Sequence, residues 1–583
     1  MKKIFKNMAW MLAATMAMAA CSDSLEESSG NGNGISTDGT GYVKIALNLP
    51  STSGTSTRVN GENDDFNDGL EAEYNVNNVI LALFYGENES DAEFKWATNL
   101  NTNFANNEST NITSSSAYVV SEVPQPEPGQ SIFALAIVNG SGYFGVQNNE
   151  LTFDATGKSG TTPFTGVFSK LFESASISDV DLNIIASTTD DGNFMMANAP
   201  ISDIASVGKN VTWSPKITTL VKLNFYEDKS TAEESASDPI YVERVAAKVS
   251  VKINNATGPT LEIKENQTVV GHVDFSGWIL QTTNKKTYLV RNVTEWGNWV
   301  GYYNDDNSVS AKENRFVGTT SGPYRTYWGI DPNYSSLISE NELDDNFTIY
   351  SEDNDLNWLD PATLSTTSGG EAVAYCAENT TIAKAMQQDQ LTGVLLKATY
   401  KDANGDAANI FTCGNVSTIY PEATMLEAFE QTLSLSSGDL KIKENATGAI
   451  ITTADELTEV IGLNDGGDLD SEQAQKILNE YSPIKFYKKG ETFYYASLIK
   501  HFGDTYTPVD AIVNLDDYNE NDHLGRWGVV RNNWYELSIN SVSGLGEPTI
   551  PDNPELPADT EESYINCTIN VLSWAKRSQS VDL

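Results

Sequence analysis

Short runs in which apolar and polar residues alternate recur along this chain of 583 residues. Gly-, Asn- and Asp-rich turns separate them, and the clearest runs lie at residues 42–50, 75–86, 131–142, 242–258, 391–406 and 532–546. Side chains of a strand point alternately to the two faces of a sheet, so such runs indicate strands with one buried face. The pattern therefore predicts an all-β protein built from β-sandwiches.

Helical spacing is confined to two stretches, residues 421–433 and 470–482, where we expect short helices. Polar and acidic residues accumulate at 224–239 before a strong strand pattern resumes. We therefore predict a first domain over residues 41–240 and a second over 241–547. The irregular, aromatic-rich stretch from about 283 to 360 is interpreted as an insertion in the second domain.

The N-terminus has the pattern of an export signal. Three lysines lie among the first six residues, Met8–Ala19 is apolar, and two alanines precede Cys21. This resembles a bacterial lipoprotein signal, although Met18 stands where such signals prefer leucine. We expect residues 1–21 to be the signal, with Cys21 the lipidated residue, and residues 22–40 to be a flexible, polar tether.

The charge of the chain excludes two classes of partner. Thirty-six Lys and Arg residues stand against 80 Asp and Glu residues, which gives a formal net charge of −44. Nucleic acids and anionic membrane surfaces both require a basic face. The composition therefore predicts no nucleic-acid partner.

Two strand patterns at opposite ends of the chain are alike. Each has four alternating apolar residues on one face. In the first strand these residues are Val43, Ile45, Leu47 and Leu49. In the second they are Ile565, Cys567, Ile569 and Val571.

The surroundings of the two strands suggest strand exchange. Arg58, the first arginine of the chain, lies in a polar loop where an arginine-specific protease would release the first strand. The second strand follows a spacer, residues 548–563, with four prolines at a spacing of three, which predicts a stiff polyproline II rod. The C-terminal strand of one copy could then fill the groove left in another and build a head-to-tail polymer. The simpler alternative is that both strands pair within their own chain.

No pattern of catalytic, cofactor-binding or metal-binding residues is present in the sequence. His272, His501 and His523 have no spacing suited to a metal site or a nucleophile triad. Two acidic stretches, residues 353–357 and 517–521, begin like calcium loops but lack the required Gly and Glu at later positions, so we expect solvated acidic loops there, with calcium binding as the alternative. We therefore predict that the protein is not an enzyme.

Two questions remain open at this stage. Cys376 and Cys413 could form a disulfide or remain buried thiols, because the number of cysteines after Cys21 is odd. A surface lipoprotein that binds glycans through the Trp and Tyr residues of 287–334 is the alternative function.

Several motifs resemble the type V pilus fimbrillin family, particularly its major shaft subunits. The strongest is RWGVVRNNWYELSINSVSGLGEP at residues 526–548. The resemblance extends to VERVAAKVSV at 242–251, YCAENT at 375–380, VLLKATY at 394–400 and NFMMANAP at 193–200.

The resemblance implies two transthyretin-like Greek-key β-sandwich domains and a C-terminal donor strand at about residues 564–583. It also implies an outer-membrane lipoprotein that is cleaved after Arg58 and polymerises into a cell-surface fimbrium, supporting adhesion and biofilm formation. The implied partners are further copies of the chain, anchor and tip subunits, an arginine-specific protease and unidentified surface ligands. A tip or accessory adhesin is the alternative within the family.

Overall fold

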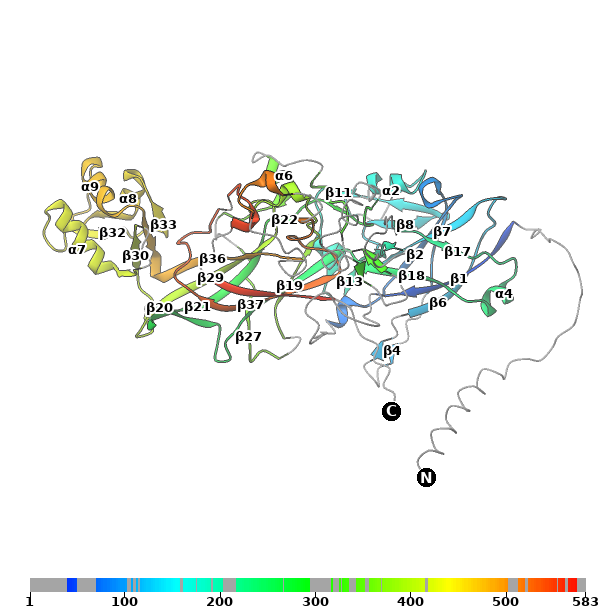
Figure 1. The fold of residues 1–583 in the computed structure, drawn as a ribbon, viewed down its shortest axis with the longest axis horizontal. Coiled ribbons are helices and arrows are strands. Elements are labelled where there is room, and N and C mark those ends of the chain that lie inside the picture. Colours follow the sequence, from blue (N-terminus) through cyan, green and yellow to red (C-terminus); the bar gives the residue numbers. More distant parts are fainter. Residues whose placement is uncertain are drawn as a thin grey trace, which may run out of the picture.

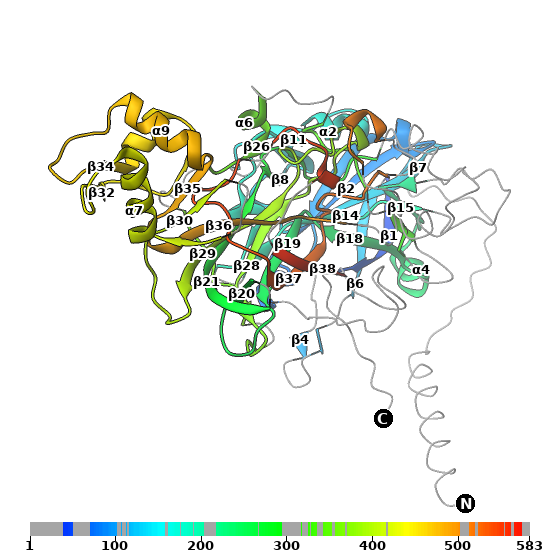
Figure 2. The same ribbon diagram turned by 60° about the vertical axis from the view of Figure 1, so that its left-hand side comes forward.

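The structure is a computed structural model. It describes residues 39–49, 70–101, 106–107, 112–113, 116–157, 161–174, 176–189, 192–202, 217–265, 267–293, 316–317, 324–326, 328–334, 342–351, 356–367, 370–414, 418–501, 512–518, 523–552, 554–560 and 565–573. Strands dominate these residues, with a few short helices (Figures 1 and 2), so the all-β prediction is confirmed. Within the described ranges, no helix is long and apolar enough to cross a membrane.

The N-terminal domain is built on one large sheet with the strand order β3-β2-β7-β14-β18-β1-β6, and β17 also pairs with β7. The strands are β1 Thr40–Asn48, β2 Val79–Gly86, β3 Glu93–Asn99, β6 Ser116–Pro124, β7 Ser131–Val138, β14 Met196–Asn198, β17 Val221–Leu223 and β18 Asp238–Arg244. β18 joins the two halves of the sheet, because its first half pairs with β1 and its second half with β14. Side chains from both halves share one apolar core.

The C-terminal domain is a sandwich of two sheets around a second core. One sheet has the order β27-β19-β37-β38, with β28 also paired to β19, and the other has the order β20-β21-β29-β36. The strands are β19 Ala246–Ile253, β20 Thr260–Glu265, β21 Thr268–Gln281, β27 Ala362–Thr363, β28 Val373–Ala377, β29 Gly393–Asp402, β36 Glu491–Leu498, β37 Asn533–Val542 and β38 Ile565–Ser573.

The domain boundary lies a few residues later than the sequence predicts. β18 stays in the N-terminal sheet as far as Arg244, and β19 begins in the C-terminal sheet at Ala246. The predicted division near residues 240 and 241 thus lies within a few residues of the change from one sheet to the other. The acidic run that suggested it forms a short helix, α4 (Lys229–Glu234), and the start of β18 instead of a linker.

A compact module with its own apolar core interrupts the C-terminal sandwich between β29 and β36. It combines the four-stranded sheet β31-β30-β35-β33 and the pair β32-β34 with three helices. Its elements are β30 Ile410–Cys413, β31 Tyr420–Pro421, β32 Leu440–Ile442, β33 Ala449–Ile451, β34 Ile461–Leu463, β35 Ile484–Tyr487, α7 Glu422–Leu433, α8 Ala454–Val460 and α9 Ser471–Tyr481. The module lies at the end of the molecule opposite the N-terminal domain (Figure 1).

The described part of the predicted insertion bridges the two domains. Within it, β22 (Thr283–Asn284) pairs with β26 (Phe347–Thr348). β23 (Thr287–Tyr288) pairs with β11 (Ser176–Ile177), which precedes β14 in the N-terminal part of the chain. This stretch therefore forms part of the junction between the domains.

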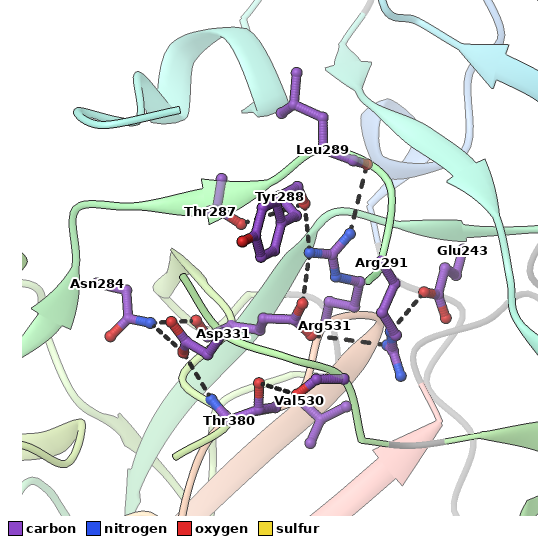
Figure 3. A network of polar contacts seen from close by, with 12 residues as sticks. Glu243, Asn284, Thr287, Tyr288, Leu289, Arg291, Asp331, Thr380, Val530 and Arg531 are labelled. Carbon is purple, nitrogen blue, oxygen red and sulfur yellow. Dashed lines mark hydrogen bonds and ion pairs between the residues drawn. The ribbon is translucent and has the colours of Figure 1, made fainter. Parts of the chain in front are cut away.

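Buried ion pairs hold the junction together (Figure 3). Arg531, from the segment before β37, contacts Glu378 at 2.5 Å and donates to the Tyr288 carbonyl at 2.6 Å. Arg291 Nε lies 2.8 Å from Glu243 Oε1 on β18. Buried side chains of opposite charge, from elements of both domains, therefore pair with one another at the junction.

A second buried cluster joins the same domains through Glu73 in the 3₁₀ turn η1 (Glu71–Glu73). Its carboxylate lies 2.8 Å from Lys248 Nζ of β19 and accepts a 2.6 Å hydrogen bond from Tyr375 of β28. Its carbonyl accepts from Arg244 Nε at 2.9 Å. Lys248 Nζ also lies 3.8 Å from the ring centre of Trp534, a cation–π contact. These contacts therefore anchor the chain to the junction at Glu73.

We expect Glu73→Ala to lower the free energy of unfolding by about 3–5 kcal/mol, since it removes the carboxylate opposite a buried ammonium. Denaturant unfolding measures this loss. Glu262→Ala removes an exposed pair with Lys264 and should cost no more than about 1 kcal/mol. The double change Glu73→Leu with Lys248→Met should cost less than Glu73→Ala alone, and an equal or larger cost would contradict the role of the charge pair.

Candidate functional site

The first strand of the chain is a central strand of the N-terminal sheet. β1 pairs antiparallel with β6 along its whole length, from Thr40 opposite Pro124 to Asn48 opposite Ser116. On its other edge, Ile45–Asn48 pair parallel with β18, and Tyr42 exchanges two backbone hydrogen bonds with Tyr226, of 2.7 and 2.8 Å. Removing β1 would therefore open a slot with hydrogen-bonding groups along both sides.

The inward face of β1 belongs to the core. Val43, Ile45 and Leu47 are fully buried, and Leu49 is 8% exposed. These are the four residues that the sequence singled out as the apolar face. Burial of four aliphatic side chains corresponds to roughly 6–12 kcal/mol of transfer free energy, so the N-terminal core depends on a strand in this place.

The outward face of β1 is covered by α4, which lies against both β1 and β6 (Figure 1). Lys44 Nζ donates to the carbonyls of Glu233 and Ser235 at the end of the helix, at 2.7 and 2.8 Å. Ala46, two residues further along the same face, is only 5% exposed. α4 is not among the helices predicted from the sequence. Its start could have been recognised from Asp228, because aspartate commonly caps the first turn of a helix by accepting a hydrogen bond from the backbone N–H three residues later.

The other strand of interest, β38, lies at the edge of the C-terminal sheet. It pairs antiparallel with β37, from Ile565 opposite Val542 to Ser573 opposite Asn533. Ile565 is buried, whereas Cys567 and Ile569 are half-buried and their neighbours Asn566 and Thr568 are exposed. In the isolated chain, then, β38 occupies its own sandwich.

The proline spacer does not hold β38 away from its own domain, so the prediction of a free polyproline rod is wrong. The carbonyls of Leu556 and Pro557 accept hydrogen bonds from Gln388, at 2.9 and 3.2 Å. Ala558 is fully buried and begins a 3₁₀ turn, η8 (Ala558–Thr560). The spacing of prolines sets a local preference, but these tertiary contacts override it.

A buried ion pair fixes the end of the spacer. Arg526 donates to Asp559 through Nε and Nη2, at 2.9 and 2.7 Å, and Tyr518 Oη donates to the same carboxylate at 2.9 Å. Arg526 and Asp559 side chains are 4% and 3% exposed. The body of the protein thus holds the chain as far as Thr560, five residues before β38.

The remaining predicted positions fall into two groups. Cys21 and Arg58 lie outside the described residues, as do Tyr564 and the chain after Ser573. No disulfide joins Cys376, Cys413 or Cys567 to another described cysteine. Burial raises the pKa of the Cys376 and Cys413 thiols to about 12, so neither is a reactive thiolate at neutral pH.

The described aromatic residues do not form the exposed platform that a glycan site at 287–334 would need. Trp328 and Tyr334 are buried, and Tyr334 Oη donates to the Gln390 carbonyl at 2.5 Å. Tyr288 is half-buried at the junction. Elsewhere, His501 and His523 are buried, and the described ranges contain no cluster of three or more metal-ligating side chains.

One protein family matches the chain. Residues 485–580 fit the model described as "Major fimbrial subunit protein type IV, Fimbrillin, C-terminal". This range contains β36, β37 and β38, and also Arg526 and Arg531 of the two ion-pair clusters. The predicted resemblance to the fimbrillins is thereby confirmed for the C-terminal part of the chain. Among curated proteins, no match was found.

Several solved structures are similar in outline. A candidate cell adhesion protein from Parabacteroides distasonis is 14% identical, with 92% of this chain and 98% of that chain covered and a TM-score of 0.37. One from Bacteroides eggerthii is 11% identical, with the same coverage and a TM-score of 0.34. A fimbrial assembly protein from Parabacteroides distasonis is 11% identical over 66% of this chain and 86% of that chain, with a TM-score of 0.23.

Ile45→Ala is expected to lower the free energy of unfolding of the intact chain by about 2–5 kcal/mol, because it leaves a cavity in the N-terminal core. Ile450→Ala is the control, since Ile450 is 40% exposed and its loss should change stability by no more than about 0.5 kcal/mol. Denaturant unfolding compares the two variants. Equal effects would show that β1 does not support the core.

We expect Asp228→Ala to loosen α4. The Asp228 side chain accepts from Ser230 Oγ and from the N–H and hydroxyl of Thr231, and these hydrogen bonds lower its pKa to about 2. The cap is fully ionised above the ordinary aspartate pKa and is lost as the pH falls from about 4 to about 2. Lower protection against hydrogen exchange at the Ala232 and Ser235 amides, relative to the intrinsic rate at the same pH, measures the loss in the variant and at low pH. Unchanged exchange would show that the cap does not hold the helix.

Proposed function

From its fimbrillin C-terminal region, residues 485–580, we propose that this chain is a polymerising shaft subunit of a surface fimbrium. In this proposal the precursor is exported as a lipoprotein acylated at Cys21, and cleavage after Arg58 by an arginine-specific protease releases β1. The C-terminal strand of a second copy then fills the vacated slot. Acylation and proteolysis are carried out by other proteins, and the chain itself is structural.

The position of β1 is the observation that carries the proposal. It is a central strand with a fully buried apolar face, yet it comes first in the chain and is followed by the segment that contains Arg58. One cut there separates the strand covalently from the rest of the sheet. After one such cut, a central strand in the interior of the chain would remain tethered to the sheet by its other end.

A comparison of β38 in its own sandwich with a strand in the slot of β1 indicates which of the two places the strand would favour. In its own sandwich β38 pairs along one edge with β37, and Cys567 and Ile569 are half-buried. In the slot of β1 a strand would pair along both edges and bury its apolar face fully. The second ladder of hydrogen bonds, at about 0.5–1.5 kcal/mol each, and the additional apolar burial favour the slot. These gains oppose the entropy cost of association.

The junction contacts explain how the body survives the cut. Glu73 is held by Lys248, Tyr375 and Arg244, so the first described turn after Arg58 is anchored independently of β1. At the other end, Asp559 holds the chain on Arg526 just before β38. The body is therefore held at Glu73 and at Asp559 by contacts that involve neither β1 nor β38.

The proposed polymer would be joined to anchor and tip subunits and would begin at the outer membrane before reaching the cell surface, where it supports adhesion and biofilm formation. A tip or accessory subunit would use the same cleavage but would not need to donate a strand. The presence of both β1 and β38 favours the shaft role.

Treating the full chain with an arginine-specific protease should convert it into polymers, seen as a ladder by native electrophoresis and as filaments by electron microscopy. Arg58→Gln should prevent conversion because β1 stays in place. A chain lacking Tyr564–Leu583 should be cut normally but remain monomeric, because it has no donor strand.

Mixing the two defective chains is the sharper test. The cut chain without residues 564–583 can only accept a strand, and the Arg58→Gln chain can only donate one. Together they should form one-to-one complexes and nothing larger. Polymers from either defective chain alone, or no complex from the mixture, would contradict the proposal.

A further inference from the structure

The slot of β1 is closed on its outward side at one position. The outward-facing residues of β1 differ in exposure. Lys44 and Asn48 are half-buried, whereas Ala46 between them is 5% exposed. α4 lies against this side of β1, with Ala232 fully buried and its last carbonyls bound to Lys44. A strand in the slot therefore has its most restricted outward position at Ala46, two residues from the side chain that binds the end of α4.

The helix α4 does not depend on β1 for its own position. α4 connects β17 to β18, both of which stay after a cut at Arg58, and it also lies against β6. Asp228 caps its first turn. The helix is therefore still present when an incoming strand arrives.

The length of the slot is also limited. At Gly41 an added Cβ atom would lie 2.2 Å from Cζ of Phe225 and 2.6 Å from the Tyr226 carbonyl oxygen. A side chain at this position requires its neighbours to move. The unobstructed part of the slot therefore runs over residues 43–49, with inward positions at 43, 45, 47 and 49.

The donor segment Ile565–Val571 has the same length and the same four alternating apolar residues. If these residues fill the four inward positions, its outward residues are Asn566, Thr568 and Asn570. This arrangement is symmetric, so Thr568 falls at the position of Ala46 whether the strand enters parallel or antiparallel to β18. In either direction an asparagine takes the place of Lys44.

We propose that Thr568 is the register-determining residue of the donor strand, and that it takes the nearly buried place of Ala46 in the neighbouring copy. This inference rests on the strand exchange proposed above and adds its register. A shift by one residue would turn the apolar face outward. A shift by two would bring an asparagine to the position of Ala46 and leave one inward position without an apolar side chain. The nearly buried position thus admits a short side chain in one register.

The isolated chain offers a matched pair of positions for a test. Thr568 and Asn566 are both exposed on β38, and both accept a hydrogen bond from Asn540 Nδ2, at 2.9 and 3.3 Å. A large side chain at either position should leave the uncut protein equally stable. In the polymer the two positions differ, because residue 568 takes the place of Ala46, which is 5% exposed, whereas residue 566 takes the place of Lys44 or Asn48, which are half-buried.

The experiment compares full chains carrying Thr568→Trp, Asn566→Trp or Thr568→Ser after cutting with the arginine-specific protease. Overpacking at a nearly buried position should lower the polymer yield of Thr568→Trp by at least about tenfold. Asn566→Trp and Thr568→Ser should polymerise within about threefold of the unmodified chain. Thermal unfolding of the uncut chains should give matching midpoints.

A mixing measurement keeps the test informative if Thr568→Trp lowers stability. Its slot is unchanged, so the cut variant should still accept a donor strand and, when mixed with the unmodified chain before polymerisation, should cap growing polymers and make them shorter. Polymerisation of Thr568→Trp at the unmodified level, or equal losses for Thr568→Trp and Asn566→Trp, would overturn the proposed register. If the unmodified cut chain forms no polymer, the strand exchange itself is wrong, whatever the variants do.

Discussion

The pairing of β1 along both of its edges is the constraint on which the N-terminal domain depends. A central strand supplies two ladders of hydrogen bonds and one face of the core, so the sheet cannot keep its structure with that place empty. The place between β6 and β18 can be filled by the β1 strand of the same molecule or by an equivalent strand from another molecule. Because the strand comes first, this choice can be controlled by a single cut in the chain.

The junction between the domains makes such an exchange compatible with a stable body. Arg531 with Glu378, and Glu73 with Lys248, are buried pairs whose members come from sequence positions far apart. Buried charges are costly to separate, and they tolerate little displacement. They would therefore keep the orientation of the two domains fixed while the strands at either end change partners in the proposed exchange. The fimbrillin match includes Arg531 and the strands β37 and β38 beside it, so the matched region covers both a junction residue and the strand proposed as the donor.

Period-two alternation predicts β1, β38 and most long strands, because one buried face is a local property of the sequence. The contacts around these strands could not be predicted in the same way. The prolines of residues 548–557 favour an extended rod locally, but Gln388 and Arg526 bind the segment to the body from distant positions. The acidic run at 224–239 looks like a linker because its composition is polar. Its role depends on Lys44, which binds two carbonyls at the end of α4. These carbonyls belong to Glu233 and Ser235, which follow Lys44 by 189 and 191 positions in the sequence.

The charge of the chain bears on how copies can associate. Removal of residues 1–58 takes away five cations and four carboxylates, so the formal net charge changes only from −44 to −45 and a processed subunit would remain as acidic as the precursor. Acidic surfaces repel one another when copies meet side by side. The proposed joint escapes this repulsion locally, because Ile565–Ser573 contains no charged residue and the slot between β6 and β18 takes uncharged side chains on its inward face. A strongly acidic molecule with an uncharged joint at one strand is suited to association end to end, and long-range repulsion between its sides favours a single, unbundled filament.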